Sequence, residues 1–178
     1  MSSTLTAAEE VLQSGTWQAD AVHSHVGFAI EYLSGTFRGS FSPFEATLAN
    51  GVLRGSAQVA DVKVQDENLA GHLQSPDFFD AERTPTISFE SSEIRRDGEQ
   101  LRVSGALTVR GETHPVELAG TVGEPVTDPY GRERVGLRLE GRIDRTAFGI
   151  NWNNPLPSGE PALANDVALT AELYLVRS

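Results

Sequence analysis

Apolar and polar residues alternate along most of the chain, beginning at Val22. Val26, Phe28 and Ile30 fall on one face of the first alternating segment, whereas His25 lies on the opposite face. Successive side chains of a β-strand point to opposite sides of its sheet. The period of two therefore predicts strands with one buried and one exposed face.

The same alternation recurs in blocks of about ten residues that are separated by turn sequences. Asn50-Gly51 is a pair preferred in type I′ hairpin turns, and Arg110-Gly111 separates two later blocks. Pro43 lies where the phase of the alternation changes, which indicates a bulge or an edge bend. The pattern predicts about eight strands, arranged either as a sandwich or as a closed antiparallel barrel.

Long strands with glycines in their middle favour the barrel. Gly27, Gly39, Gly105 and Gly141 interrupt otherwise alternating segments, and glycine relieves crowding where a sheet curls. We therefore expect residues 16–178 to form one all-β domain, an eight-stranded antiparallel β-barrel.

Two short helices complete the expected fold. Thr6 and Glu9 have the spacing of a capping box, so residues 1–15 are expected to form an N-terminal arm or a short helix. Ser75 followed by Pro76 resembles an N-cap with proline at the first helical position, which predicts a short helix near residues 75–80. The adjacent apolar pair, Phe78 and Phe79, is then expected to close one end of the barrel.

Composition excludes several classes of function. The net charge of −11 argues against binding nucleic acid or docking electrostatically on anionic lipid. The absence of cysteine excludes disulfides and thiolate chemistry. No run of about 18 apolar residues occurs, so stable membrane insertion is not expected. The N-terminus resembles no secretory signal, which predicts a cytoplasmic protein.

The predicted interior indicates the ligand class. A barrel of about eight strands is either filled by its own side chains or holds one small ligand. The inward set is almost entirely aliphatic and aromatic, with Ser24 as its main polar member. Such a lumen suits an apolar molecule better than a sugar or a nucleotide.

His23 and His25 are the residues most suggestive of a metal site. A His-x-His pair on a strand presents both imidazoles on one face, and Asp20 or His72 are the candidate third ligands. Both histidines, however, fall on the face opposite the apolar set. A structural hydrogen-bonding role is therefore favoured over a metal site.

An enzyme that shapes an apolar substrate, such as a cyclase or an isomerase, is the alternative to a binding protein. Its candidate acid or base groups are Ser24, Tyr32, His72 and Arg145. No G-x-S-x-G nucleophile elbow, dinucleotide fingerprint or phosphate-binding loop occurs, so no cofactor is expected.

The segment from Asp144 to Pro155 is rich in aromatic and amide groups. Phe148 and Trp152 are expected to pack as a lid, which either only caps the barrel or also borders the ligand entrance. Arg145 is expected to pair with Asp144, with Asp20 or with a ligand head group, and a structural pair with one of the two aspartates is favoured.

Several motifs, in the order in which they occur, resemble those of the YceI-like lipid-binding family. They cover roughly residues 16 to 176. Leu69-Ala70 departs from the pattern, because the family often has an Arg-Asp pair there. The matching pieces are Trp17-x-x-Asp20-x-x-His23-Ser24-x-Val26-x-Phe28, Gly35-x-Phe37-x-Gly39-x-Phe41, His72-Leu73-x-Ser75-x-Asp77-Phe78-Phe79-Asp80, Pro85-x-Ile87-x-Phe89, Val103-x-Gly105-x-Leu107-Thr108-Val109-Arg110-Gly111, Asp144-Arg145-x-x-Phe148-Gly149 and Asp166.

This resemblance implies a lipocalin-like barrel, usually a homodimer, whose lumen encloses a long-chain polyisoprenoid such as an isoprenoid quinone or a prenyl phosphate. We expect this chain to bind and carry or sequester such a lipid. The candidate ligand-binding residues are Ser24, Val26, Phe28, Ile30, Tyr32, Phe37, Phe41, Leu73, Phe78, Phe79, Ile87, Phe89, Leu107, Leu118, Leu137, Leu139, Arg145, Phe148, Trp152 and Leu169.

Overall fold

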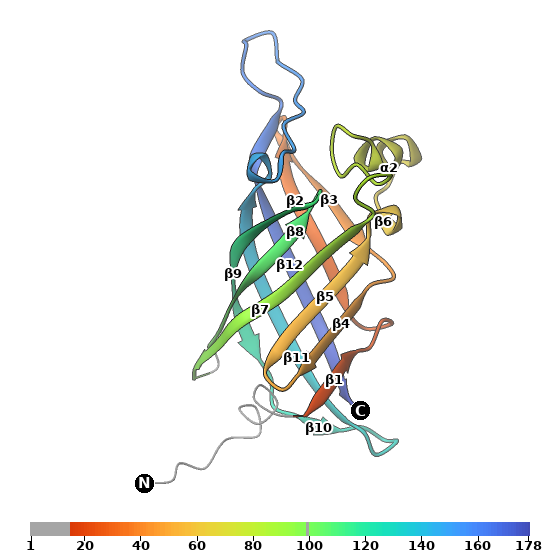
Figure 1. The fold of residues 1–178 in the computed structure, drawn as a ribbon, viewed down its shortest axis with the longest axis vertical. Coiled ribbons are helices and arrows are strands. Elements are labelled where there is room, and N and C mark those ends of the chain that lie inside the picture. Colours follow the sequence, from red (N-terminus) through yellow and green to blue (C-terminus); the bar gives the residue numbers. More distant parts are fainter. Residues whose placement is uncertain (1–14, 99) are drawn as a thin grey trace.

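The computed structural model describes residues 15–98 and 100–178, which form a closed antiparallel β-barrel (Figure 1). Within these residues, one α-helix and two 3₁₀ helices accompany the strands; these are α2 (Glu67–Gln74), η1 (Val59–Asp61) and η2 (Arg145–Phe148). The strands are β1 (Thr16–Ala19), β2 (His25–Tyr32), β3 (Gly35–Phe41), β4 (Glu45–Ala49), β5 (Val52–Gln58), β6 (Val62–Lys63), β7 (Thr86–Asp97), β8 (Gln100–Val109), β9 (Glu112–Val122), β10 (Val126–Thr127), β11 (Glu133–Asp144) and β12 (Leu163–Arg177).

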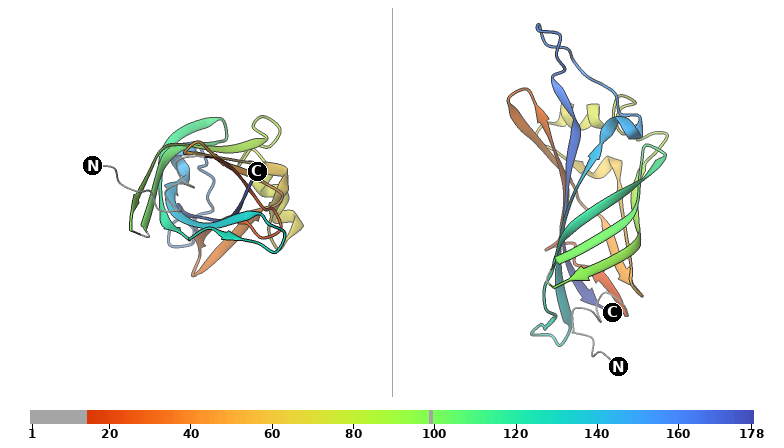
Figure 2. Two further views of the ribbon diagram at one scale, coloured as in Figure 1. Left: turned by 90° about the horizontal axis from the view of Figure 1, so that it is seen from below. Right: turned by 90° about the vertical axis from the view of Figure 1, so that its left-hand side faces the viewer.

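Eight strands make the wall, because four of them are interrupted. Strand β1 continues as β2, β3 as β4, β5 as β6 and β9 as β10, so that each pair occupies one place in the ring. Strand β12 closes the barrel by pairing with β11 on one side and with both β1 and β2 on the other. The end-on view in Figure 2 shows the strands as a ring. The predicted eight-stranded barrel is confirmed.

The turn residues explain why neighbouring strands form hairpins. Asn50 and Gly51 have φ angles of 51° and 82°, and Arg110 and Gly111 have φ angles of 56° and 75°. Positive φ at both central residues is the requirement of a type I′ turn, which matches the twist of paired strands. Pro43, where the alternation changes phase, lies in the break between β3 and β4.

The two ends of the barrel are packed differently. At the lower end in Figure 1, which we call the filled end, inward side chains of all eight wall strands meet in a continuous core. Trp17, Leu48 and Leu175 in this core are no more than 1% exposed. At the other end, which we call the open end, α2 and η2 lie beside the strand ends. A second apolar cluster surrounds the space below them.

The helix predicted near residues 75–80 lies immediately before that stretch, as α2. Asp66 is its N-cap, since its carboxylate accepts hydrogen bonds from the backbone N–H of Asn68 at 2.7 Å and of Leu69 at 3.3 Å. Ser75 is the C-cap and not the predicted N-cap. Pro76 has no N–H to continue the helix, so residues 76–79 form turns. The predicted N-terminal arm or helix over residues 1–15, with its capping box, lies outside the described residues except for Gly15.

Candidate ligand-binding cavity

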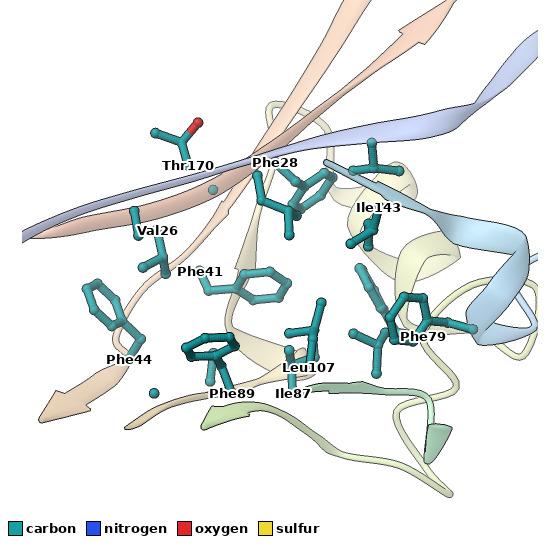
Figure 3. Close-up of a pocket in the computed structure, with 18 of the residues that line it drawn as sticks. Val26, Phe28, Phe41, Phe44, Phe79, Ile87, Phe89, Leu107, Ile143 and Thr170 are labelled. Atoms are coloured by element: carbon teal, nitrogen blue, oxygen red, sulfur yellow. The ribbon is translucent and has the colours of Figure 1, made fainter. Parts of the chain in front are cut away.

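A cavity of about 490 Å³ occupies the lumen between the filled end and the open end (Figure 3). Leu53, Leu139 and Leu173 belong both to the packed core and to the cavity lining, so they form its floor. Its walls come from inward positions of the strands, because alternate residues of each strand face the lumen. The volume falls in the range of natural small-molecule sites.

The candidate residues identified from the sequence line this cavity, with the exceptions of Ser24 and Leu137. Figure 3 shows seven of them, Val26, Phe28, Phe41, Phe79, Ile87, Phe89 and Leu107, which converge from strands on several sides of the lumen. The agreement reflects the strand alternation, which assigns faces correctly. Whether each residue contacts a ligand stays a prediction.

Ser24 does not face the lumen, because the chain turns before β2 begins. Asp20 organises that turn: its Oδ1 accepts from the N–H of Val22 at 2.9 Å, and its carbonyl accepts from the N–H of Ser24 at 2.9 Å. The Ser24 hydroxyl instead accepts from the N–H of Tyr174 at 2.9 Å, tying the turn to β12. Ser24 is therefore removed both as a lining residue and as an acid or base in the lumen.

Leu137 faces inward as predicted but lies below the cavity. It is 3% exposed and packs within the filled end, whereas Leu139, the next inward residue of β11, reaches the cavity floor. The boundary between packed core and hollow lumen passes between these two positions. Leu137 is therefore a core residue.

Glycines keep the lumen hollow by giving large side chains a place against the wall. Phe28 of β2 and Gly39 of β3 are directly paired, so both face the lumen. The Phe28 ring lies over Gly39, where a Cβ would come within 2.4 Å of Cζ. In the same way, a Cβ at Gly105 would come within 2.6 Å of the Phe89 ring. Because the rings lie along the wall, they line the cavity without filling it.

The segment after α2 covers the open end. Phe79 packs against Phe28 and Phe41 with ring centroids 6.2 and 5.9 Å apart. Arg110 of the β8–β9 turn donates to the carbonyl of Phe78 at 3.1 Å, which joins the segment to the barrel rim. The expectation that Phe78 and Phe79 close one end of the barrel agrees with these contacts.

Trp152 connects this covering segment to the loop between β11 and β12. The rings of His72 and Trp152 are 4.9 Å apart, and those of Phe78 and Trp152 are 5.4 Å apart. Asp77 lies 3.0 Å from Nε2 of His72 and orients that ring. All of these except Asp77 line the cavity, so two segments far apart in sequence share the rim.

Arg145 is the only buried cation among residues 15–98 and 100–178, with 3% exposure. Its Nε donates to Ala164 O at 2.8 Å, and its Nη1 donates to the carbonyls of Ile150 at 2.9 Å and Trp152 at 2.8 Å. Burial lowers the pKa of its guanidinium, and the charge of Asp144 opposes that shift. The predicted ion pair with Asp20 or Asp144 is wrong, because Asp20 pairs with Arg134 and no described carboxylate lies within 4.0 Å of Arg145.

The cavity also includes lining residues that were not among the candidates. Val109, Val116, Ile143 and Val167 lie on inward strand positions and could have been found from the same alternation. Ile150 comes from the loop after β11, where no periodicity indicates which side chains turn inward. Leu69, at the position where the sequence departs from the family pattern, also lines the cavity.

His23 and His25 lie outside the lumen, and both are exposed. Nδ1 of His23 is 2.7 Å from Asp20. Hydrogen bonds from His23 and then from Arg134 lower the pKa of Asp20 to about 2. Within the described part of the chain, no three His, Asp or Glu side chains are grouped as metal ligands would be. The His23 contacts fit the structural role that the sequence favoured.

Fold and cavity together define a closed β-barrel with an internal apolar cavity. The chain belongs to the YceI-like family, because the sequence model of the YceI-like domain matches residues 17–175. The UPF0312 protein SERP2314 of Staphylococcus epidermidis is 31% identical over 164 residues, which are 85% of this chain and 92% of that protein. Protein YceI of Escherichia coli O157:H7 is 32% identical over 136 residues, covering 72% of this chain and 71% of that protein.

Solved structures share the fold at lower sequence identity. Burkholderia cenocepacia BcnA superposes with a TM-score of 0.72 at 20% identity, over 90% of this chain and 99% of that one. A polyisoprenoid binding domain from Saccharophagus degradans superposes with a TM-score of 0.68 at 12% identity, over 91% of this chain and 98% of that one. At these identities the likeness shows the fold alone.

Within the described ranges, no helix is long and apolar enough to cross a bilayer.

Proposed function

We propose that this protein binds a long-chain apolar lipid of the polyisoprenoid type in its barrel cavity, and sequesters or carries it. The observation that carries the proposal is the cavity itself, about 490 Å³ of lumen walled almost entirely by aliphatic and aromatic side chains. The polyisoprenoid binding domain from Saccharophagus degradans, which shares the fold, supports the choice of ligand class.

The energetics of burial favour such a ligand. Each methylene removed from water contributes about 0.8 kcal/mol, so a long hydrocarbon chain binds with few polar contacts. The floor residues Leu53, Leu139 and Leu173 offer no hydrogen-bonding side chain to a sugar or a nucleotide. On this proposal the cavity favours ligands with a long hydrocarbon chain over polar molecules such as sugars or nucleotides.

An isoprenoid quinone and a prenyl phosphate are the two ligand types that we propose. We also propose that the protein is a homodimer and acts in the cytoplasm. Light scattering and cell fractionation test these two points separately from ligand binding.

A pair of adjacent substitutions on β5 tests the proposal. Ala57 is buried and lines the cavity, whereas the neighbouring Gln58 is exposed. Ala57→Trp places a large ring in the lumen, and Gln58→Trp places the same ring on the surface. Binding of geranylgeraniol is measured by displacement of the neutral fluorophore N-phenyl-1-naphthylamine.

We expect geranylgeraniol to bind the wild type and Gln58→Trp with similar affinity, and Ala57→Trp at least tenfold more weakly. If Ala57→Trp folds and binds as tightly as Gln58→Trp, the ligand does not occupy the lumen and the proposal fails.

A further inference from the structure

The open end of the cavity carries a buried charge, Arg145, which is 3% exposed, whereas the charged residues lining the wall, Glu45 and Arg54, are exposed. His72 and Arg145 line the open end, where Trp152 lies between them: its ring contacts His72, and its carbonyl accepts from Arg145. The floor, formed by Leu53, Leu139 and Leu173, is apolar. A chain-like amphiphile therefore fits in one direction, with its tail on the floor and its head group at the open end.

Arg145 carries a positive charge that no described carboxylate contacts within 4.0 Å, although the charge of Asp144 acts on it from farther away. Carbonyl oxygens satisfy its Nε and Nη1 at 2.8–2.9 Å, but Nη2 has only a contact of 3.5 Å with Leu163 O. A guanidinium has two N–H donors on Nη2. A buried charge without a counter-ion is costly, and an oxyanion beside it forms a short, charge-assisted hydrogen bond.

Asp144, the nearest acidic residue in sequence, is already engaged elsewhere. Its Oδ1 accepts from the N–H of Thr146 at 2.9 Å and from the Thr146 hydroxyl at 2.6 Å. The carboxylate therefore caps η2 and does not pair with Arg145.

From these contacts we infer that the cavity prefers a single-chain amphiphile whose head group carries an anionic oxygen, a phosphate or a carboxylate, and that Arg145 is the residue that sets this preference. The inference rests on the proposed function, because it assumes that the lumen takes an apolar chain.

Matched pairs of ligands that differ only in the head group provide the test. Farnesyl phosphate is compared with farnesol, and hexadecanoate with 1-hexadecanol, each by displacement of N-phenyl-1-naphthylamine below the micelle concentration and at fixed salt. The wild type is expected to bind the anion of at least one pair about tenfold to hundredfold more tightly. The pair that shows the preference identifies the head group as phosphate or carboxylate.

Three variants assign the preference to Arg145. Arg145→Met removes the charge at similar volume, and Arg145→Lys keeps a charge if the methionine variant does not fold. Arg142→Met is the matched control, because Arg142 lies three residues earlier on β11 and its side chain is 69% exposed. The anion preference is expected to disappear in Arg145→Met, to shrink in Arg145→Lys, and to persist in Arg142→Met.

The outcomes separate this inference from the function on which it rests. Equal affinity of the wild type for the anionic and neutral members of both pairs overturns the inference and leaves the apolar binding function in place. An anion preference that survives in both Arg145 variants assigns the head group to another residue and also overturns it. If no member of either pair binds, the proposed function fails, and the inference fails with it.

Discussion

The ring of Phe28 lies across Gly39, its direct partner on the neighbouring strand, at a place where a Cβ would come within 2.4 Å of Cζ. Both residues face the lumen, so the ring occupies the space that a side chain at position 39 would take. This pairing of an aromatic residue with a glycine explains how a barrel lined by phenylalanines retains a cavity.

Gly39→Ala is expected to push the Phe28 ring away from the wall and into the cavity. We expect affinity for geranylgeraniol to fall about tenfold, with a loss of about 1–3 kcal/mol in the free energy of unfolding from overpacking. Gly136→Ala on β11 is the control, because a Cβ there meets no atom within 4 Å. Fluorophore displacement and urea unfolding measure both variants. Unchanged affinity in Gly39→Ala would show that the ring position does not control the cavity.

The two inward leucines Leu137 and Leu107 are expected to respond differently to truncation. Leu137→Ala leaves a hole in the packed core and should cost about 2–5 kcal/mol of unfolding free energy while leaving ligand affinity unchanged. Leu107 already faces the cavity, so Leu107→Ala should cost only about 1–2 kcal/mol and should weaken binding. Urea unfolding with fluorophore displacement gives both quantities. Equal losses of stability would contradict the division into a filled end and a hollow lumen.

The two tryptophans report on opposite ends of the barrel. Trp17 is 1% exposed in the filled end, whereas Trp152 lines the cavity. A brominated fatty acid, which quenches indole emission on contact, should therefore quench Trp152 in a Trp17→Phe variant and leave Trp17 nearly unaffected in a Trp152→Phe variant. Equal quenching of the two residues would contradict the position of the cavity.

The ion-pair cluster around Asp20 predicts a dependence of stability on pH. Hydrogen bonds from His23 and Arg134 lower the pKa of Asp20 from 3.8 to about 2. Because the folded state favours the ionised form, this stabilisation is present above pH 3.8 and is lost as the pH falls through 2. Asp20→Asn should cost about 1 kcal/mol near neutral pH, the pair being partly exposed, and clearly less than that near pH 2.

Urea unfolding from pH 2 to pH 7 measures this difference, with Asp61→Asn as a control that removes a carboxylate outside the cluster. A constant difference between the wild type and Asp20→Asn across this range would contradict the assignment.

Alternation along the sequence was enough to predict which strand residues face inward, because that choice depends only on the period of two. It could not separate Leu137 from Leu139, since their difference lies in height along the barrel axis, which depends on how neighbouring strands are staggered. Arg145 is a candidate from the sequence, but two of its carbonyl partners, at positions 150 and 152, lie in a loop without periodicity, and the third, Ala164, lies at the start of β12.

Two local predictions, the N-cap at Ser75 and the inward position of Ser24, are wrong for a common reason. In each case several polar residues close together could form the hydrogen bonds that decide the local structure. Asp66 and Ser75 are both good N-cap residues, and the helix begins after Asp66 because eight residues without proline follow it. Ser24 continued the alternation of β2 in sequence, but the turn organised by Asp20 ends just before that strand. In both cases the hydrogen bonds of one aspartate, Asp66 or Asp20, decide the local structure. The sequence alone does not show which of the nearby polar residues forms these bonds.

The most direct test of the central claim is native mass spectrometry of the freshly purified protein, followed by organic extraction and mass analysis of the released molecules. If the lumen is a lipid site, one prenyl lipid is expected per barrel, released on unfolding and absent from Ala57→Trp. A protein that is empty as purified and takes up no added polyprenol would contradict the account.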